Sequence, residues 1–125
     1  MRNLIAVMIA GGVGAVARYG LDGLVSARSS SSQFPWGTFV VNVSGCLVLG
    51  FLYALLTERY TVDPVLRVGL TVGLVGSYTT FSTWALETAQ LGQAGSWLIA
   101  GANLLANLVV GLLALLAGTA IGRLV

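Results

Sequence analysis

One stretch interrupts a segment that otherwise has the composition of a membrane helix: Gly73-Leu-Val-Gly-Ser-Tyr-Thr-Thr-Phe-Ser-Thr-Trp84. Glycine and hydroxylated side chains favour non-helical backbone, because hydroxyls compete for backbone hydrogen bonds. Within a bilayer, such backbone is tolerated only where it is buried in protein or lines a polar cavity. We therefore predict a helix break over Gly76 to Thr80 that is built to hold an ion. The alternative is a glycine-rich bend that serves close helix packing.

The overall composition places the chain in a membrane. Of its 125 residues, 57% are hydrophobic and 8% are charged, whereas a soluble domain carries about a quarter charged residues. At about 20 residues per membrane-spanning helix, the length accommodates four helices. We place them at about residues 4–25, 38–56, 65–91 and 97–124, in one domain over residues 1–125. The predicted fold class is an all-α integral membrane protein whose third helix is broken near its middle.

Several functional classes lack the residues that they need. The chain has no histidine and no cluster of carboxylates, so catalysis by a metal or by histidine is excluded and an enzyme is not expected. Its net charge of +2 comes from scattered arginines, which does not suit nucleic acid. The single Cys46 forms no intrachain disulfide. Residues 1–17 resemble a signal peptide, but apolar sequence resumes after Arg18, which favours a first membrane helix.

Polar residues within the apolar segments are candidate functional residues. Arg18 either faces the helix bundle or reaches the membrane interface with Asp22 as its partner. Asn42 either joins two helices or points into a pore. Glu87 either faces the same cavity as the break or, as we slightly favour, is an ordinary charge at a helix end.

The last segment carries polar and small residues on one face. The residues recur at spacings of three and four: Asn103, Asn107, Gly111, Ala114, Gly118 and Gly122. This stripe is either a packing seam or one wall of a polar groove. Amides, hydroxyls, a guanidinium and aromatic ring edges are groups that suit a small anion, and backbone carbonyls freed at a helix break suit a small cation. The residues alone thus predict a small pore or carrier for an inorganic anion.

Three blocks resemble the signature blocks of the CrcB/Fluc family of fluoride channels. They are Gly11-Gly12-x-Gly14-Ala15-x-x-Arg18-Tyr19, Gly37-Thr38-x-x-Val41-Asn42-x-x-Gly45 and Gly73-x-x-Gly76-x-x-Thr79-Thr80-Phe81-Ser82-Thr83, in family order. The resemblance implies a multi-pass channel of the bacterial inner membrane that lowers cytoplasmic fluoride by passive efflux. It also implies an antiparallel, dual-topology homodimer, or a heteromer with a paralogue, and a structural sodium ion held by the backbone carbonyls of Gly76 and Thr79.

The same resemblance assigns roles to single residues. Asn42 matches the pore amide, Phe81 the first phenylalanine of the fluoride path, and Arg18 the arginine of the first block, a vestibule candidate. The candidate pathway residues are Asn42, Thr80, Phe81, Ser82, Trp84, Asn103 and Asn107, with Glu87 uncertain.

Three departures from the family pattern distinguish this chain. Trp84 stands where the family has a second phenylalanine, Ser77 replaces a second glycine, and Gly111 and Leu115 leave the lower end of the last helix apolar. The indole N–H of Trp84 is expected to hold fluoride tightly, so that Trp84→Phe conducts faster. The alternative is that Trp84 only packs at the helix interface, in which case Trp84→Phe changes stability or dimer yield and leaves the fluoride current the same. A small multidrug-type proton-coupled exporter is the alternative function, but such a carrier needs a carboxylate inside its first helix, where this chain has Arg18. A membrane adaptor that transports nothing would not need the hydroxyl-lined break.

Overall fold

A computed structural model describes all residues, 1–125, and contains helices without any β-strand. The first helix is α1 (Arg2–Arg28), and the second is α2 (Trp36–Tyr53), which continues as the π-helix η1 (Ala54–Arg59). A broken segment follows, made of α3 (Pro64–Val68), η2 (Gly69–Val75), α4 (Gly76–Tyr78) and α5 (Phe81–Gln93). The last helix is α6 (Trp97–Leu124). The all-helical class predicted from the sequence is confirmed.

Three of these helices are long and apolar enough to cross a membrane: α1, α2 together with η1, and α6. Most of their apolar side chains are exposed on the single chain, as expected for surfaces that meet lipid or another subunit. The broken segment contains no continuous helix of that length, because the helix stops at Tyr78 and restarts at Phe81. A fourth membrane crossing, through this segment, stays a prediction.

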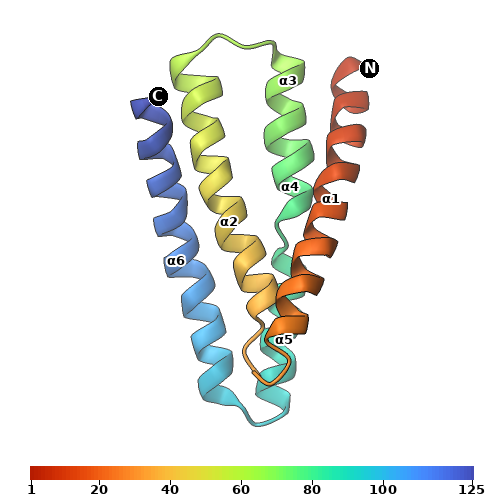
Figure 1. Cartoon of the computed structure of the whole chain (residues 1–125), viewed down its shortest axis with the longest axis vertical. Coiled ribbons are helices and arrows are strands. Elements are labelled where there is room, and N and C mark those ends of the chain that lie inside the picture. Colours follow the sequence, from red (N-terminus) through yellow and green to blue (C-terminus); the bar gives the residue numbers. More distant parts are fainter.

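The helices lie side by side in an elongated bundle (Figure 1). In this view α2 lies in the middle, with α6 on one side and the broken segment and α1 on the other. Both chain termini and the turn at 60–63 lie at one end of the bundle, and the turns at 29–35 and 94–96 lie at the opposite end.

The contact between α2 and α6 depends on glycines, each of which faces the backbone of the other helix. A methyl group added at Gly50 would overlap the carbonyl oxygen of Leu115, and one added at Gly118 would overlap that of Leu47. Two helices approach this closely only where one of the facing residues has no side chain. The C-terminal part of the predicted stripe is therefore a packing seam.

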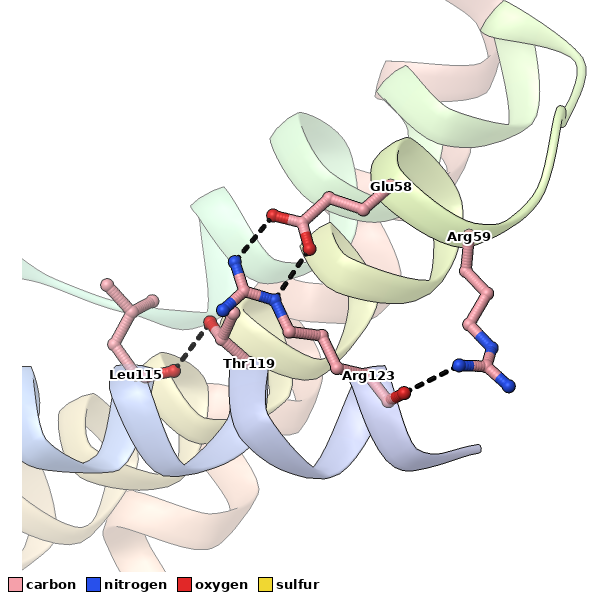
Figure 2. Close-up of polar contacts among 5 residues, drawn as sticks. All are labelled: Glu58, Arg59, Leu115, Thr119 and Arg123. Carbon is pink, nitrogen blue, oxygen red and sulfur yellow. Dashed lines mark hydrogen bonds and ion pairs between the residues drawn. The ribbon is translucent and has the colours of Figure 1, made fainter.

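The second helix extends further than the sequence suggests. We expected a loop from Thr57, but the helical backbone continues through Arg59. Figure 2 shows what this end contacts: both carboxylate oxygens of Glu58 accept hydrogen bonds from Arg123, at 2.7 and 2.9 Å. Arg59 in turn donates to the backbone carbonyl of Arg123, at 2.6 Å. These contacts from α6 give η1 partners that local sequence does not reveal. The first helix likewise runs to Arg28, past the expected end at Val25.

Candidate functional site: the helix break and its cavity

The helix break is shorter than predicted and falls at Thr79 and Thr80. Both residues have extended backbone, with φ and ψ of −78° and 157° at Thr79 and −145° and 115° at Thr80. The first part of the predicted range, Gly76 to Tyr78, stays helical. The hydroxyl of Thr80 accepts a hydrogen bond from the backbone N–H of Thr83 at 3.2 Å and so caps the start of α5. The break is therefore sharp because the new helix starts at once with its own cap.

Helix α2 fixes the position of the break. The Tyr78 hydroxyl and the Ser44 hydroxyl are 2.8 Å apart and form a hydrogen bond. Thr79 packs directly over Gly45, where an added methyl group would overlap its Cγ2 atom. A larger residue at 45 would push the extended backbone away from α2.

The side chain of Asn42 forms hydrogen bonds with both the backbone N–H and the backbone carbonyl of Thr80 at the break. Its Oδ1 accepts the N–H of Thr80 at 2.9 Å, and its Nδ2 donates to the carbonyl of Thr80 at 3.1 Å. The second Nδ2 hydrogen goes to Oδ1 of Asn107, at 3.1 Å. Buried backbone groups without such partners would each cost about 1–3 kcal/mol. Asn42 therefore joins three helical segments, as one of its two interpretations predicts, and it also borders the cavity described below.

A further set of hydrogen bonds connects α6 to α5. Nδ2 of Asn107 donates to Oδ1 of Asn103 at 2.9 Å, and Nδ2 of Asn103 donates to the hydroxyl of Thr88 at 2.8 Å. The Thr88 hydroxyl donates to the carbonyl of Trp84, at 2.7 Å. Asn103 has no exposed surface, so its side-chain amide depends on these partners for its hydrogen bonds.

A cavity of about 250 Å³ lies beside the break. Its lining contains six residues that the sequence analysis singled out: Asn42, Thr79, Thr80, Phe81, Trp84 and Asn107. The remaining lining residues are Gly45, Cys46, Leu49 and Leu108. The structure thus brings together the amides of two helices, the extended backbone and both aromatic rings.

The two aromatic rings meet edge to face, with centroids 5.1 Å apart and planes at 62°. Phe81 is 75% exposed on the single chain, whereas Trp84 is 7% exposed. The indole N–H of Trp84 donates to the backbone carbonyl of Asn103, at 3.1 Å. This bond is buried and gives the N–H an acceptor on α6, so the structure supports packing of Trp84 against α6 and gives no support to our expectation that the N–H holds fluoride. Ser82, also a candidate, is exposed and lies outside the cavity lining.

Arg18 and Glu87 both have inward partners. Nε of Arg18 donates to the carbonyl of Ser77 at 3.2 Å, and no ion pair joins Arg18 to Asp22. Glu87 accepts a hydrogen bond from the Thr38 hydroxyl at 2.8 Å, and its Oε2 atom is buried without a partner. Its carboxylate is therefore held against α2 and is not a freely solvated charge at the helix end, the interpretation that we had slightly favoured. Neither residue lines the cavity.

Comparison with known proteins decides the family. The family model described as CrcB-like protein, Camphor Resistance (CrcB), matches residues 5–119. The chain belongs to the CrcB-like family.

Curated relatives match this CrcB-like chain over nearly its whole length. A protein of Nitratidesulfovibrio vulgaris is 42% identical over 125 residues and covers 100% of both chains. One of Chloroflexus aurantiacus is 38% identical over 98% of this chain and 97% of its own. One of Magnetococcus marinus is 43% identical over 95% of this chain and 96% of its own. Each of these relatives is named a fluoride-specific ion channel FluC, which is the name of a channel and not of an enzyme. The resemblance inferred from the three sequence blocks is confirmed.

Three polar residues of the CrcB-like chain were not among the candidate site residues predicted from the sequence. Cys46 lines the cavity, Thr38 binds Glu87, and Thr88 binds Asn103. Thr88 lies one helical turn after Trp84, so its place on the same face of α5 was a usable signal.

The break offers backbone carbonyl oxygens to a metal ion, and the chain contains no cluster of three His, Cys, Asp or Glu side chains that could hold one. Carbonyl groups at the C-terminal end of a helix point along its axis beyond the last residue. Gly76 and Thr79 lie at such an end, and the carbonyl of Thr79 accepts no hydrogen bond within the chain. Carbonyl oxygens suit a hard cation such as sodium, so these residues fit the ion that the sequence resemblance implies.

Proposed function

We propose that this chain is the subunit of a fluoride-selective channel that lowers cytoplasmic fluoride by passive efflux. The supporting observation is the cavity at the helix break, where Asn42 meets the extended backbone beside the rings of Phe81 and Trp84. Relatives that cover the whole chain carry the name of a fluoride-specific channel. Their organisms are bacteria, and the bacterial inner membrane is the location we propose.

The chemistry of the cavity suits a small anion. An ion that leaves water must find groups that replace its hydration shell, yet it must bind weakly enough to leave. Aromatic ring edges are electropositive, and the first N–H groups of a helix have no partner within that helix. Helix α5 begins at Phe81, so both kinds of group lie at the cavity. The amide hydrogens of Asn42 point to oxygen atoms at 3.1 Å, and a passing fluoride replaces those oxygens for a short time.

A second copy of the chain completes the proposed pathway. The ring of Phe81 is largely exposed on the single chain, so one side of the path is open. An antiparallel pair would cover it, and a paralogue is the other candidate partner. The distribution of arginines argues somewhat against insertion in both orientations, because cytoplasmic loops of membrane proteins carry an excess of Lys and Arg. The end of the bundle with the termini carries four arginines: Arg2, Arg59, Arg67 and Arg123. The opposite end carries Arg28, and Arg18 is assigned to neither end.

Labelling of introduced cysteines tests the orientation. In a Cys46→Ala background, Ser30→Cys and Thr61→Cys place thiols in the turns at opposite ends of the bundle. Dual topology predicts that an impermeant maleimide labels about half of each variant from one side of the membrane. If one variant is labelled completely from that side and the other not at all, the antiparallel dimer is wrong.

Sodium at the carbonyls of Gly76 and Thr79 is the second part of the proposal. The ion would join the two copies by taking oxygen ligands from both. Protein dialysed into a salt of a large organic cation should lose fluoride flux and regain it when sodium returns. Flux that is the same with and without sodium would remove the ion from the account.

Fluoride efflux from liposomes tests the function itself. Vesicles that contain the purified protein are loaded with potassium fluoride or potassium chloride, and a potassium ionophore balances charge. The proposal predicts release of fluoride and retention of chloride, without a proton gradient. Equal release of both anions, or no release, contradicts it. Flux that requires a proton gradient would instead favour the proton-coupled exporter.

A further inference from the structure

A hydrogen-bond chain leaves the helix break, crosses two other helices and returns to the same segment. It starts at the backbone N–H of Thr80 and ends at the backbone carbonyl of Trp84, both in the broken segment. Between them it passes through Asn42 on α2, Asn107 and Asn103 on α6, and Thr88 on α5. The donor–acceptor distances along this path are 2.9, 3.1, 2.9, 2.8 and 2.7 Å.

The direction of this chain is fixed at both ends. A backbone N–H only donates and a backbone carbonyl only accepts, so each side chain between them has one allowed orientation. Thr88 determines the orientation at the α5 end. Its single hydroxyl proton goes to the carbonyl of Trp84, so the same oxygen can only accept from Asn103. Asn103 must therefore turn its Nδ2 to Thr88 and its Oδ1 to Asn107.

The consequence reaches the cavity two amides away. Nδ2 of Asn107 donates to the Oδ1 of Asn103 at 2.9 Å and to its backbone carbonyl at 3.1 Å, so Asn107 presents its own Oδ1 to Asn42. That oxygen holds one of the two Nδ2 hydrogens of Asn42 beside the break. Without the Thr88 hydroxyl, Nδ2 of Asn103 is buried without an acceptor, or it rotates and gives up its Oδ1 contact with Asn107. In the second case Asn107 keeps only its bond to the backbone carbonyl of Asn103, at 3.1 Å, and its Oδ1 is held less firmly against Nδ2 of Asn42.

We propose that Thr88 is a positioning residue for the fluoride pathway: it does not touch the ion, and it fixes the Asn103 side chain, which in turn holds Asn107 against Asn42. Thr88 lies outside the cavity lining, and its hydroxyl contacts Asn103 and Trp84. This inference rests on the proposed fluoride conduction.

Substitution of the hydroxyl by a methyl group tests the inference. Thr88→Val keeps the shape of the side chain and removes both hydrogen bonds. We expect about a fivefold loss of fluoride flux per folded dimer, because one hydrogen bond in the chain from Thr88 to Asn42 is weakened. Thr88→Ser keeps the hydroxyl and should conduct like the parent. Thr119→Val is the matched control: Thr119 also donates to the carbonyl four residues before it, at 2.9 Å, but accepts no side-chain bond (Figure 2).

A double substitution separates positioning from general destabilisation. If Thr88 acts through Asn103, Thr88→Val should cost little more flux in an Asn103→Ala background, whereas unrelated effects multiply. Should Thr88→Val fail to fold, Thr88→Cys replaces it, since a thiol accepts hydrogen bonds weakly.

The outcomes distinguish the two proposals. No fluoride flux from the parent protein would overturn the proposed channel function. Parent flux with equal flux from Thr88→Val, or from Thr88→Cys in its place, would overturn the positioning role and leave the channel function intact. Loss in both Thr88→Val and Thr88→Ser would overturn the role of the hydroxyl.

Discussion

In the N-terminal half of α6, Asn103 and Asn107 hold α2 and α5 through amide hydrogen bonds, whereas in the C-terminal half glycines let α2 approach to backbone contact. Both halves use the same stripe of the helix at spacings of three and four residues. The first half needs particular atoms in particular orientations, and the second needs only space. A substitution should therefore affect conduction in the first half and assembly in the second.

The largest effect should come from filling the glycine seam. Gly118→Leu would place a side chain against the backbone of Leu47 and Phe51 on α2, which neither helix can move aside cheaply. We expect loss of folded protein in size-exclusion chromatography. Gly101→Ala on the same helix is the control, because nothing lies within 4 Å of the added methyl group. Normal yield of Gly118→Leu would show that the two helices are not packed as described.

The next largest effect should come from Asn42→Asp in the amide half. A carboxylate only accepts hydrogen bonds, so it loses the bonds donated to the carbonyl of Thr80 and to Oδ1 of Asn107, and its charge repels an anion. We expect fluoride flux to fall to roughly a tenth of the parent value or less, on loss of two hydrogen bonds. Asn3→Asp adds the same charge at an exposed end of α1 and should leave flux unchanged.

Phe81→Ile, which removes a ring edge at the cavity, should reduce fluoride flux about as much as Asn42→Asp does.

Trp84→Phe tests the N-terminal half of α6, which carries Asn103 and Asn107, because Trp84 packs against that half from α5. The substitution removes the bond from the indole N–H to the carbonyl of Asn103 and keeps a ring edge at the cavity. We expect a loss of about 1 kcal/mol in unfolding free energy, with fluoride flux within about twofold of the parent. Trp97→Phe, at an exposed residue, is the control. A several-fold rise in flux without loss of stability would mean that the indole N–H meets the anion, as we first expected.

The smallest effect should come from the exposed ion pair between Glu58 and Arg123, near the C-terminal end of α6. Glu58→Gln weakens the paired hydrogen bonds with Arg123, and exposed ion pairs contribute little because water and salt screen them. We expect melting temperature and flux close to those of the parent. A large drop in melting temperature would show that the end of η1 depends on this pair.

The sequence was sufficient to locate the break and the residues that gather around it. Glycines and hydroxyls in an apolar segment predict a break, and spacing places Asn103 and Asn107 on one face of a helix. Spacing does not give the partner of a side chain on another helix. Asn42 and Asn107 are 65 residues apart, and their hydrogen bond depends on how the two helices are rotated against each other.

Three features could not be predicted for this reason. The indole N–H of Trp84 has its acceptor on α6, 19 residues away. Glu87 finds Thr38 on α2, 49 residues away. The helix through Arg59 is held by Arg123, near the other end of the chain. In each case the local sequence allows several partners, and packing selects one.

A reversal potential measures the central claim most directly, because it reports which anion crosses the membrane through this protein. The purified protein is placed in a planar bilayer with sodium fluoride on one side and sodium chloride on the other. Our account predicts a steady current whose reversal potential lies close to that of a membrane permeable to fluoride alone, and loss of that current in Asn42→Asp. A reversal potential near zero, which shows equal passage of both anions, or an unchanged current in Asn42→Asp, would contradict it.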